Sequence, residues 1–265
     1  MRWRGAFLAL LWALLLAPAA WADALPAVQE ACAPRVLAVQ AARTLDGARP
    51  EQGWVDVTLP EVWTRRWPDH GGSVWYRIDW ERGCAPGQGQ PLALGIDGVS
   101  VAGEVFINDD LLWRDASLVE PLSRSWNMPR WWLLPASSLR EGVNQVWVRA
   151  VGPLALSPGL GALRIGAAPM VAEQYGQSLW RQRTVYLINA VLCAMAGALF
   201  LLVWLLHRKE RAYGWFGLMA LCWLAYLSTY LAETQWPWPD SLARARFSMV
   251  SLVCYVLCVC MFTFR

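Results

Sequence analysis

Two stretches of this 265-residue chain decide the predicted fold: SVWYRIDW at residues 73–80 and GVSVAGEVFINDDLLW at residues 98–113. In the first stretch every second residue from Val74 to Trp80 is apolar, and a mixed set of residues lies between them. This alternation predicts a β-strand with one apolar face. In the second stretch, Asn108, Asp109 and Asp110 tolerate tight-turn geometry, so they predict a hairpin between two strands.

Similar short apolar runs, separated by Gly, Pro, Asn and Asp, fill the region from residue 23 to residue 169 and indicate an all-β domain. The expected strands are residues 54–59, 73–80, 91–96, 103–108, 111–113, 131–134, 144–150 and 162–166. Strands spaced in this way predict a β-sandwich or a jelly roll.

The composition of the whole chain narrows its functional class. Hydrophobic residues make up 57% of the chain and charged residues 16%, with a net charge of +3. Low hydrophobicity and high net charge are what keep a chain disordered, so the composition excludes that class. The small net charge argues against a nucleic-acid partner, because such proteins present a strongly basic face.

The first 22 residues are typical of a secretory signal peptide. Arg2 and Arg4 precede an apolar run, and Ala20 and Ala22 form an A-x-A cleavage motif before Asp23. An uncleaved membrane anchor is the alternative, which the short run and Pro18 disfavour. We therefore expect the β domain, residues 23–169, to fold in the bacterial periplasm.

The cysteines agree with export. Cys32 and Cys84 are the two that fall in the β region, and an isolated pair in an exported domain indicates a disulfide. Two unrelated thiols remain the alternative, since the sequence does not supply their separation. The other five lie in apolar runs, where buried thiols are expected rather than a metal site.

Three apolar runs predict transmembrane helices at residues 184–206, 212–232 and 247–264, each long enough to cross a bilayer. With the β domain outside, the basic turn HRKER at residues 207–211 would face the cytoplasm. Asn189 lies deep in the first run, where an amide more often joins two helices than carries a transported ion. Residues 170–183 repeat apolar side chains every four positions and predict a juxtamembrane helix.

Two motifs in the β region resemble a known module. The stretch at residues 98–113, followed by SSLREGVNQVWVRAVG at residues 137–152, resembles the jelly-roll, galactose-binding-like module of glycoside hydrolases and their relatives. The E-V-x-x-N-G hairpin of that module has Asp109 here in place of Gly. The order of signal peptide, Trp-rich jelly roll, WRQR at residues 180–183 and apolar helices resembles the bacterial seven-transmembrane receptors with diverse intracellular signalling modules.

The resemblance implies a receptor of the inner membrane. Its periplasmic domain would bind a small ligand, a carbohydrate or a carboxylate, and its helices would signal to a diguanylate cyclase or a histidine kinase. Three expected spans instead of seven, and an end at Arg265, lead us to expect a fragment or a truncated gene. A homodimer is compatible with such a receptor, but no sequence feature demonstrates one.

The densest mixture of aromatic and hydrogen-bonding side chains runs from Trp113 to Trp132. Such a mixture suits a ligand pocket, because aromatic rings stack on sugars and polar groups bind hydroxyls or carboxylates. The predicted ligand-binding residues are Trp113, Arg114, Arg124, Trp126, Asn127, Arg130 and Trp131. The alternative is that the Trp residues fill the core and the Arg residues pair with nearby acids.

No residue set predicts catalysis or a cofactor. Asp69 and His70 are adjacent, but two glycines follow them and a loop is the favoured interpretation. A membrane-anchored carbohydrate-active hydrolase is the main alternative function, although no convincing pair of carboxylates supports it. A third alternative is an assembly protein of the cell envelope.

Overall fold

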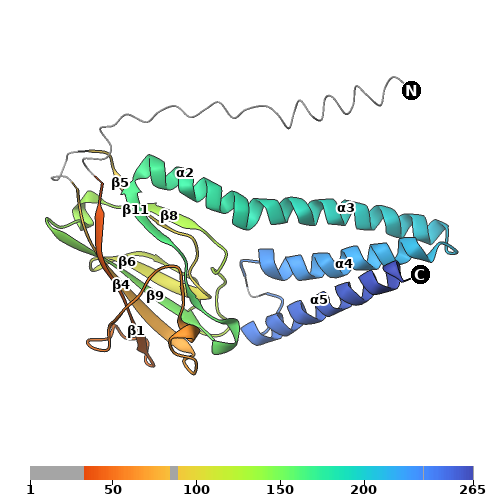
Figure 1. Ribbon diagram of the computed structural model, residues 1–265, viewed down its shortest axis with the longest axis horizontal. Helices are drawn as coiled ribbons and strands as arrows, with labels where there is room; N and C mark the ends of the chain where they lie inside the picture. The colour runs from red at the N-terminus through yellow and green to blue at the C-terminus, as the bar shows by residue number, and fades with distance from the viewer. Residues whose placement is uncertain (1–32, 84–88, 235, 265) are drawn as a thin grey trace, which may run out of the picture.

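The computed structural model describes residues 33–83, 89–234 and 236–264. In it a β-sandwich is followed by long helices that extend away from one end of the sandwich (Figure 1). The predicted signal peptide and the two cysteines of the predicted disulfide, Cys32 and Cys84, lie outside the described residues.

The larger layer of the sandwich is an antiparallel sheet of six strands. In spatial order they are β2 (Val55–Asp56), β1 (Arg35–Thr44), β4 (Gly72–Glu81), β9 (Val143–Gly152), β6 (Ala102–Ile107) and β7 (Asp110–Arg114). The ten-residue strand β4 pairs along its whole length with β9 and along nearly all of it with β1, so it lies in the middle of this sheet.

The opposite layer has two smaller antiparallel sheets, one of β11 (Leu163–Ala167), β5 (Leu92–Ile96) and β8 (Arg130–Leu133), the other of β10 (Gly159–Leu160) and β3 (Glu61–Val62). The hydrophobic core lies between the layers. Its fully buried members include Trp63, Tyr76, Ile78, Trp80, Leu94 and Val148. Short 3₁₀ turns at Trp63–Arg65, Ala136–Ser138 and Leu154–Leu156 connect strands.

The alternation in residues 73–80 gives the expected result, because Val74, Tyr76, Ile78 and Trp80 are all fully buried in the core. The hairpin is also confirmed: β6 and β7 pair, and Asn108 adopts the left-handed conformation at φ 53° between them. Strand β1 was not predicted. Its sequence RVLAVQAART is rich in Ala and polar residues, which are weak strand formers, and its place is set by pairing with β4.

After the sandwich the chain forms one long helix. It consists of α2 (Ala168–Leu179), a π-helical segment (Trp180–Thr184) and α3 (Val185–Leu206). Helix α2 packs on the sheet of β11, β5 and β8, where Val171 is 1% exposed. A Cβ atom at Gly95 would come within 2.9 Å of Val171 Cγ1, so the glycine allows this close approach. Thus the first turns of the helix are fixed to the sandwich.

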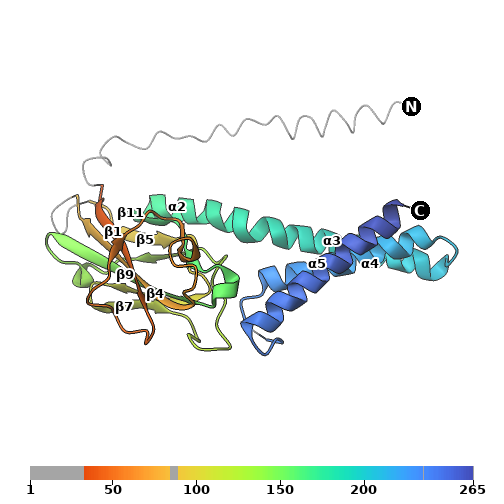
Figure 2. The same cartoon turned by 60° about the horizontal axis from the view of Figure 1, so that its bottom comes forward.

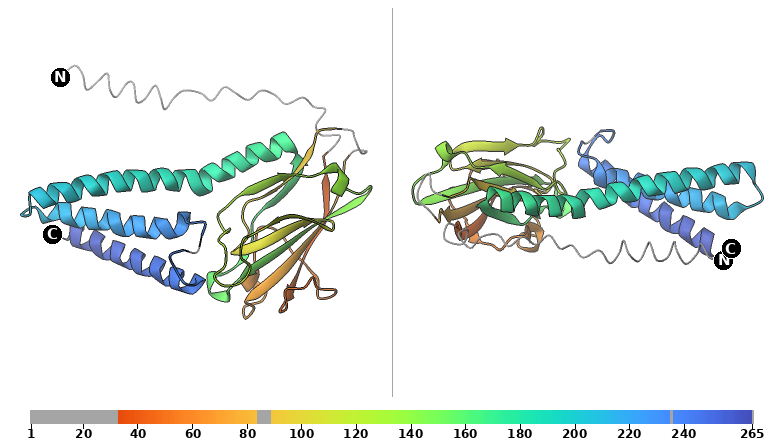
Figure 3. Two further views of the ribbon diagram at one scale, coloured as in Figure 1. Left: turned by 180° about the vertical axis from the view of Figure 1, so that it is seen from behind. Right: turned by 90° about the horizontal axis from the view of Figure 1, so that it is seen from above.

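Helix α4 (Arg211–Leu231) returns towards the sandwich alongside α3, and α5 (Ser241–Thr263) then runs outward again against α4 (Figures 2 and 3). All three long helices, counting α2 with α3, have the length and hydropathy needed to cross a membrane. Helix α5 begins six residues before the predicted span, because Asp240 caps it by accepting a hydrogen bond from Ala243 N at 2.6 Å.

Asn189 joins two helices, as predicted. Its Oδ1 accepts a hydrogen bond of 2.7 Å from Trp223 Nε1, which links α3 to α4.

Candidate functional site

An open cleft of about 420 Å³ lies where the sandwich meets the helices. We call it the junction cleft. The sandwich supplies Glu61, Asp97, Trp126 and Asn127 together with the turns around Gly98 and Gly159–Gly161. The helical side supplies Gln182, from the π-helical segment, and Tyr230, from the last turn of α4. The cleft therefore has one wall on each part of the molecule.

Glu61 stands at the start of β3 and is only 10% exposed at its side chain. Its Oε1 accepts a 3.1 Å hydrogen bond from Arg66 Nε, whereas Oε2 is buried and has no partner among the described residues. The fully buried side chain of Tyr76 lies near this carboxylate. Burial, and then the negative charge of Glu61, raise the pKa of Tyr76.

Asp97 follows β5 and connects the cleft to α2. Its two carboxylate oxygens accept hydrogen bonds from Arg164 at 2.7 and 2.8 Å, and Oδ1 also accepts one from Ser178 of α2 at 2.8 Å. Burial alone would raise the pKa of Asp97, but the hydrogen bonds from Arg164 and Ser178 outweigh it and lower the pKa. Asp97 is therefore ionised at neutral pH and holds the helix to the sandwich.

Trp126 and Asn127 meet the end of α4. The Trp126 ring lies edge-on to the Tyr230 ring at 4.7 Å between centroids, and Tyr230 lies against Tyr186 of α3 at 4.4 Å. Asn127, 2% exposed, donates from Nδ2 to the backbone oxygen of Tyr230 at 3.0 Å. Trp126 Nε1 and Asn127 Oδ1 are buried, and neither atom has a hydrogen-bond partner in the part of the chain that the structure describes.

The same loop of the sandwich also contacts α5. We call residues 115–129 the junction loop. Glu120 Oε2 accepts hydrogen bonds from the backbone N of Ser241 at 3.2 Å and from its Oγ at 3.1 Å. Nearby, Arg183 of the π-helical segment donates to Glu233, which follows the end of α4, at 2.7 Å. The junction loop thus touches the end of one helix and the beginning of the next.

The predicted ligand-binding residues do not gather at one place. Trp126 and Asn127 line the junction cleft. Arg124 lies beside them, with its guanidinium 5.3 Å from the centre of the Trp126 ring, and burial lowers its pKa to about 10.

Three of the remaining four residues lie in or against the sandwich. Arg130 stacks over Trp113 at 4.1 Å and donates to Ser125 Oγ at 3.0 Å, and Trp113 in turn packs against Trp132 and the core. Trp131 pairs in register with Gly95, so it stands on the face that α2 covers.

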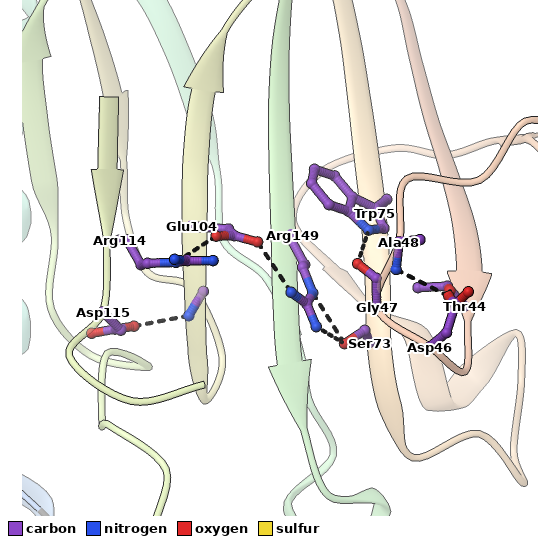
Figure 4. Close-up of polar contacts among 11 residues, drawn as sticks. Thr44, Asp46, Gly47, Ala48, Ser73, Trp75, Glu104, Arg114, Asp115 and Arg149 are labelled. Carbon is purple, nitrogen blue, oxygen red and sulfur yellow. Dashed lines mark hydrogen bonds and ion pairs between the residues drawn. The ribbon is translucent and has the colours of Figure 1, made fainter. Parts of the chain in front are cut away.

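Arg114 belongs to a polar network on the outer face of the six-stranded sheet (Figure 4). Glu104, 3% exposed, accepts from Arg114 at 2.7 Å and from Arg149 at 3.2 Å, and Arg149 reaches Ser73 (Figure 4). Beside it, Trp75 Nε1 donates to the backbone oxygen of Gly47, which holds a loop across the sheet. In these contacts Arg114 pairs with a nearby acid within the domain, which agrees with the alternative interpretation of this arginine.

The loop interpretation of Asp69 and His70 fits their placement. Asp69 is exposed, whereas His70 is buried with Nε2 at 3.0 Å from the backbone oxygen of Ser73. The prediction from sequence did not include Glu61, Asp97, Gln182 and Tyr230. Each is a single polar residue in or beside a different element, and no local pattern marks such residues as neighbours.

No protein-family model and no curated protein matches the chain. Among solved structures, it is similar to a GH2 β-galacturonidase from Eisenbergiella tayi, with 14% identity and a TM-score of 0.36 over 52% of this chain and 25% of that one. A β-glucuronidase from Faecalibacterium prausnitzii is 18% identical, with a TM-score of 0.35 over 48% of this chain and 22% of that one. A β-galactosidase from Bacteroides fragilis, described as putative, is 16% identical, with a TM-score of 0.35 over 50% of this chain and 23% of that one. The chain spans a quarter or less of these enzymes, and similarity at this level says nothing about its function.

Proposed function

We propose that this chain is the sensory part of a membrane receptor. In this proposal the sandwich is a jelly roll of the galactose-binding-like type in the periplasm, and α3, α4 and α5 cross the inner membrane. A small polar ligand binds at the junction cleft, and its binding changes how the helices are held. The output implied by the sequence resemblance is a diguanylate cyclase or a histidine kinase.

The observation that carries the proposal is that the junction loop binds the last turn of α4 and the first turn of α5. The last carbonyls of a helix and its first N–H groups lack partners within the helix. Asn127 offers an N–H donor to Tyr230 O in the last turn of α4, and Glu120 offers a carboxylate to the first N–H of α5. The negative charge of Glu120 also has the sign that the helix dipole favours at an N-terminus.

This arrangement supports signalling because the cleft and the helix ends share residues. Asn127 both lines the cleft and binds α4, while Asp97 both lines the cleft and binds α2. A ligand that moves either residue therefore alters a contact that holds a helix. A simple tether between domain and membrane would need no such shared residues.

The hydrolase alternative has less support. Glycoside hydrolysis needs one carboxyl group that stays protonated to donate to the leaving group. Both carboxylates of the cleft are paired with an arginine, and the pKa of Asp97 is lowered rather than raised. These are poor conditions for a general acid.

Calorimetry and amide hydrogen exchange on the full chain in lipid nanodiscs test the proposal. The binding probes are glucose, glucosamine, glucuronate, galacturonate and succinate, and the 4-nitrophenyl glycosides of the four sugars test turnover, because a free sugar has no glycosidic bond to hydrolyse. We expect saturable binding of at least one probe without turnover, accompanied by altered exchange at the end of α4 and the start of α5. Turnover would indicate the enzyme, binding with unchanged exchange would indicate a mere binding module, and no binding would favour the assembly role; each result contradicts the proposal.

A further inference from the structure

The charges around the junction cleft select the kind of ligand, if the cleft is the sensory site of the proposed function. Glu61 and Asp97 line it, and among its described lining residues there is no Lys, Arg or His. Their partners Arg66 and Arg164 bind them from outside the lining. An anion in the cleft would approach carboxylate oxygens, while Arg66, Arg164 and Arg124, which lies beside Trp126, stand outside the lining; this is electrostatically unfavourable for the anion.

The hydrogen-bonding groups favour a ligand with donors. Among the described lining residues, Glu61 Oε2 and Asn127 Oδ1 are buried acceptors without a partner, and Trp126 Nε1 is the one such donor; the buried Tyr76 hydroxyl, which interacts with Glu61, and Arg124 Nε lie outside the lining. A buried polar group without a partner calls for an explanation such as a ligand or a water molecule. Ammonium and hydroxyl groups would satisfy the acceptors, and the edge of a Trp126 indole can donate to a hydroxyl oxygen.

We infer that the junction cleft binds a hydroxylated ligand that is neutral or positively charged, held between the sandwich and the helices, and that it rejects carboxylates. The ligand would contact Glu61, Trp126 and Asn127 on the sandwich. On the helical wall it would contact Gln182 and Tyr230, which face the same cleft. Contact with both walls is what makes binding at this place capable of moving the helices.

Three probes with the same sugar ring test the charge preference: glucosamine, glucose and glucuronate carry positive, zero and negative charge at pH 6. Calorimetry uses the full chain in phosphatidylcholine nanodiscs. We expect glucosamine and glucose to bind and glucuronate to bind at least ten-fold more weakly, since a nearby unit charge at an effective dielectric constant of about 20 has effects of this size.

Gln182→Lys places a positive charge on the helical wall and leaves the buried groups of the sandwich unchanged. It should strengthen glucuronate binding and weaken glucosamine binding, each about ten-fold. Gln177→Lys is the matched control, because Gln177 is exposed on α2 and is not among the residues that line the cleft. It should leave both affinities unchanged.

The possible failures are distinct. Glucuronate binding as tightly as glucosamine overturns the charge inference and leaves the receptor proposal standing. Equal effects of Gln182→Lys and Gln177→Lys place the ligand outside the junction cleft and also overturn the inference. Preference for glucosamine with unchanged exchange at α4 and α5 supports the inference and contradicts the receptor proposal. Absence of binding by all three probes contradicts both.

Discussion

Asp97 shows how one carboxylate can hold two parts of the molecule together. It accepts two hydrogen bonds from Arg164 of β11 and one from Ser178 of α2, while its side chain is 20% exposed. Hydrogen bonds to a charged group in such a setting are stronger than bonds between neutral groups. The attachment of α2 to the sandwich therefore depends on the ionised form of this residue.

We predict that Asp97→Asn lowers the free energy of unfolding by roughly 1–3 kcal/mol at pH 7, because it removes charge-assisted hydrogen bonds. The pKa of Asp97 is lowered in the folded chain from its ordinary value of 3.8. Its stabilisation is therefore present above about pH 4 and is lost as the pH falls through the lowered pKa. Thermal unfolding of the chain in nanodiscs between pH 3 and pH 7 measures this, and the variant should lack that part of the pH dependence.

Asp109→Asn provides the matched control for this prediction. Asp109 makes an ion pair with Arg140 in an exposed turn, with 77% of its side chain accessible to solvent. Exposed pairs contribute little, so its free energy of unfolding should change by less than about 1 kcal/mol. Equal losses in the two variants would contradict the role assigned to Asp97.

At the level of single residues, the sequence could predict part of the candidate site. Trp126 and Asn127 lie in a stretch rich in aromatic and polar residues, and this local composition predicted them as site residues. Glu61, Asp97, Gln182 and Tyr230 join them only through the packing of loops and helices that are distant in the chain. Density along the sequence also marked Arg114, which pairs with Glu104 on a different face.

At the level of elements, close packing of α2 on the sandwich depends on a glycine. Gly95→Ala would place a Cβ atom 2.9 Å from Val171 Cγ1, and that branched side chain is fully buried. We predict a loss of roughly 1–3 kcal/mol in the free energy of unfolding, as is usual for overpacking. Urea unfolding measures the loss, and amide exchange of residues 168–179 should show weaker protection.

Gly166→Ala tests the same interface with a more adaptable neighbour. The atom nearest to the added Cβ, at 2.4 Å, is the terminal methyl of Met170, which can rotate away. The free energy of unfolding should change by no more than about 0.5 kcal/mol.

Val171→Ala combined with Gly95→Ala should lower the free energy of unfolding by less than the sum of the two single changes. Strict additivity would show that the clash does not determine the packing.

The elements that could be predicted are those whose structure is determined by their own local sequence. The alternation in β4 and the turn residues after β6 act locally, and both elements form as expected. The composition of β1 favours neither a helix nor a strand, and β1 is a strand because it pairs with β4. The early start of α5 depends on Asp240, a capping residue that hydropathy alone ignores.

At the scale of the whole molecule, the contacts at the junction fix which ends of the helices lie together. Glu120 holds the start of α5 against the sandwich, so residues 232–234 and 236–240 lie on the sandwich side. The turn at residues 207–210 lies at the opposite end of α3, which has 22 residues and is therefore about 33 Å long (Figure 1). This length matches the roughly 30 Å of hydrocarbon in a bilayer.

We therefore predict that the two connections lie on opposite sides of the membrane. A protease site inserted after Lys209 should be cut in inverted vesicles and protected in right-side-out ones, and a site inserted after Trp236 should behave in the reverse way. Arg208, Lys209 and Arg211 favour the cytoplasmic side for the first turn only weakly, because Arg181, Arg183, Arg244 and Arg246 flank the helices on the other side. The expected orientation rests mainly on the predicted signal peptide. Cleavage of both sites from one side would mean that the helices lie along the surface, and a reversed pattern would place the sandwich in the cytoplasm. Either result would remove the basis for a ligand arriving from the periplasm.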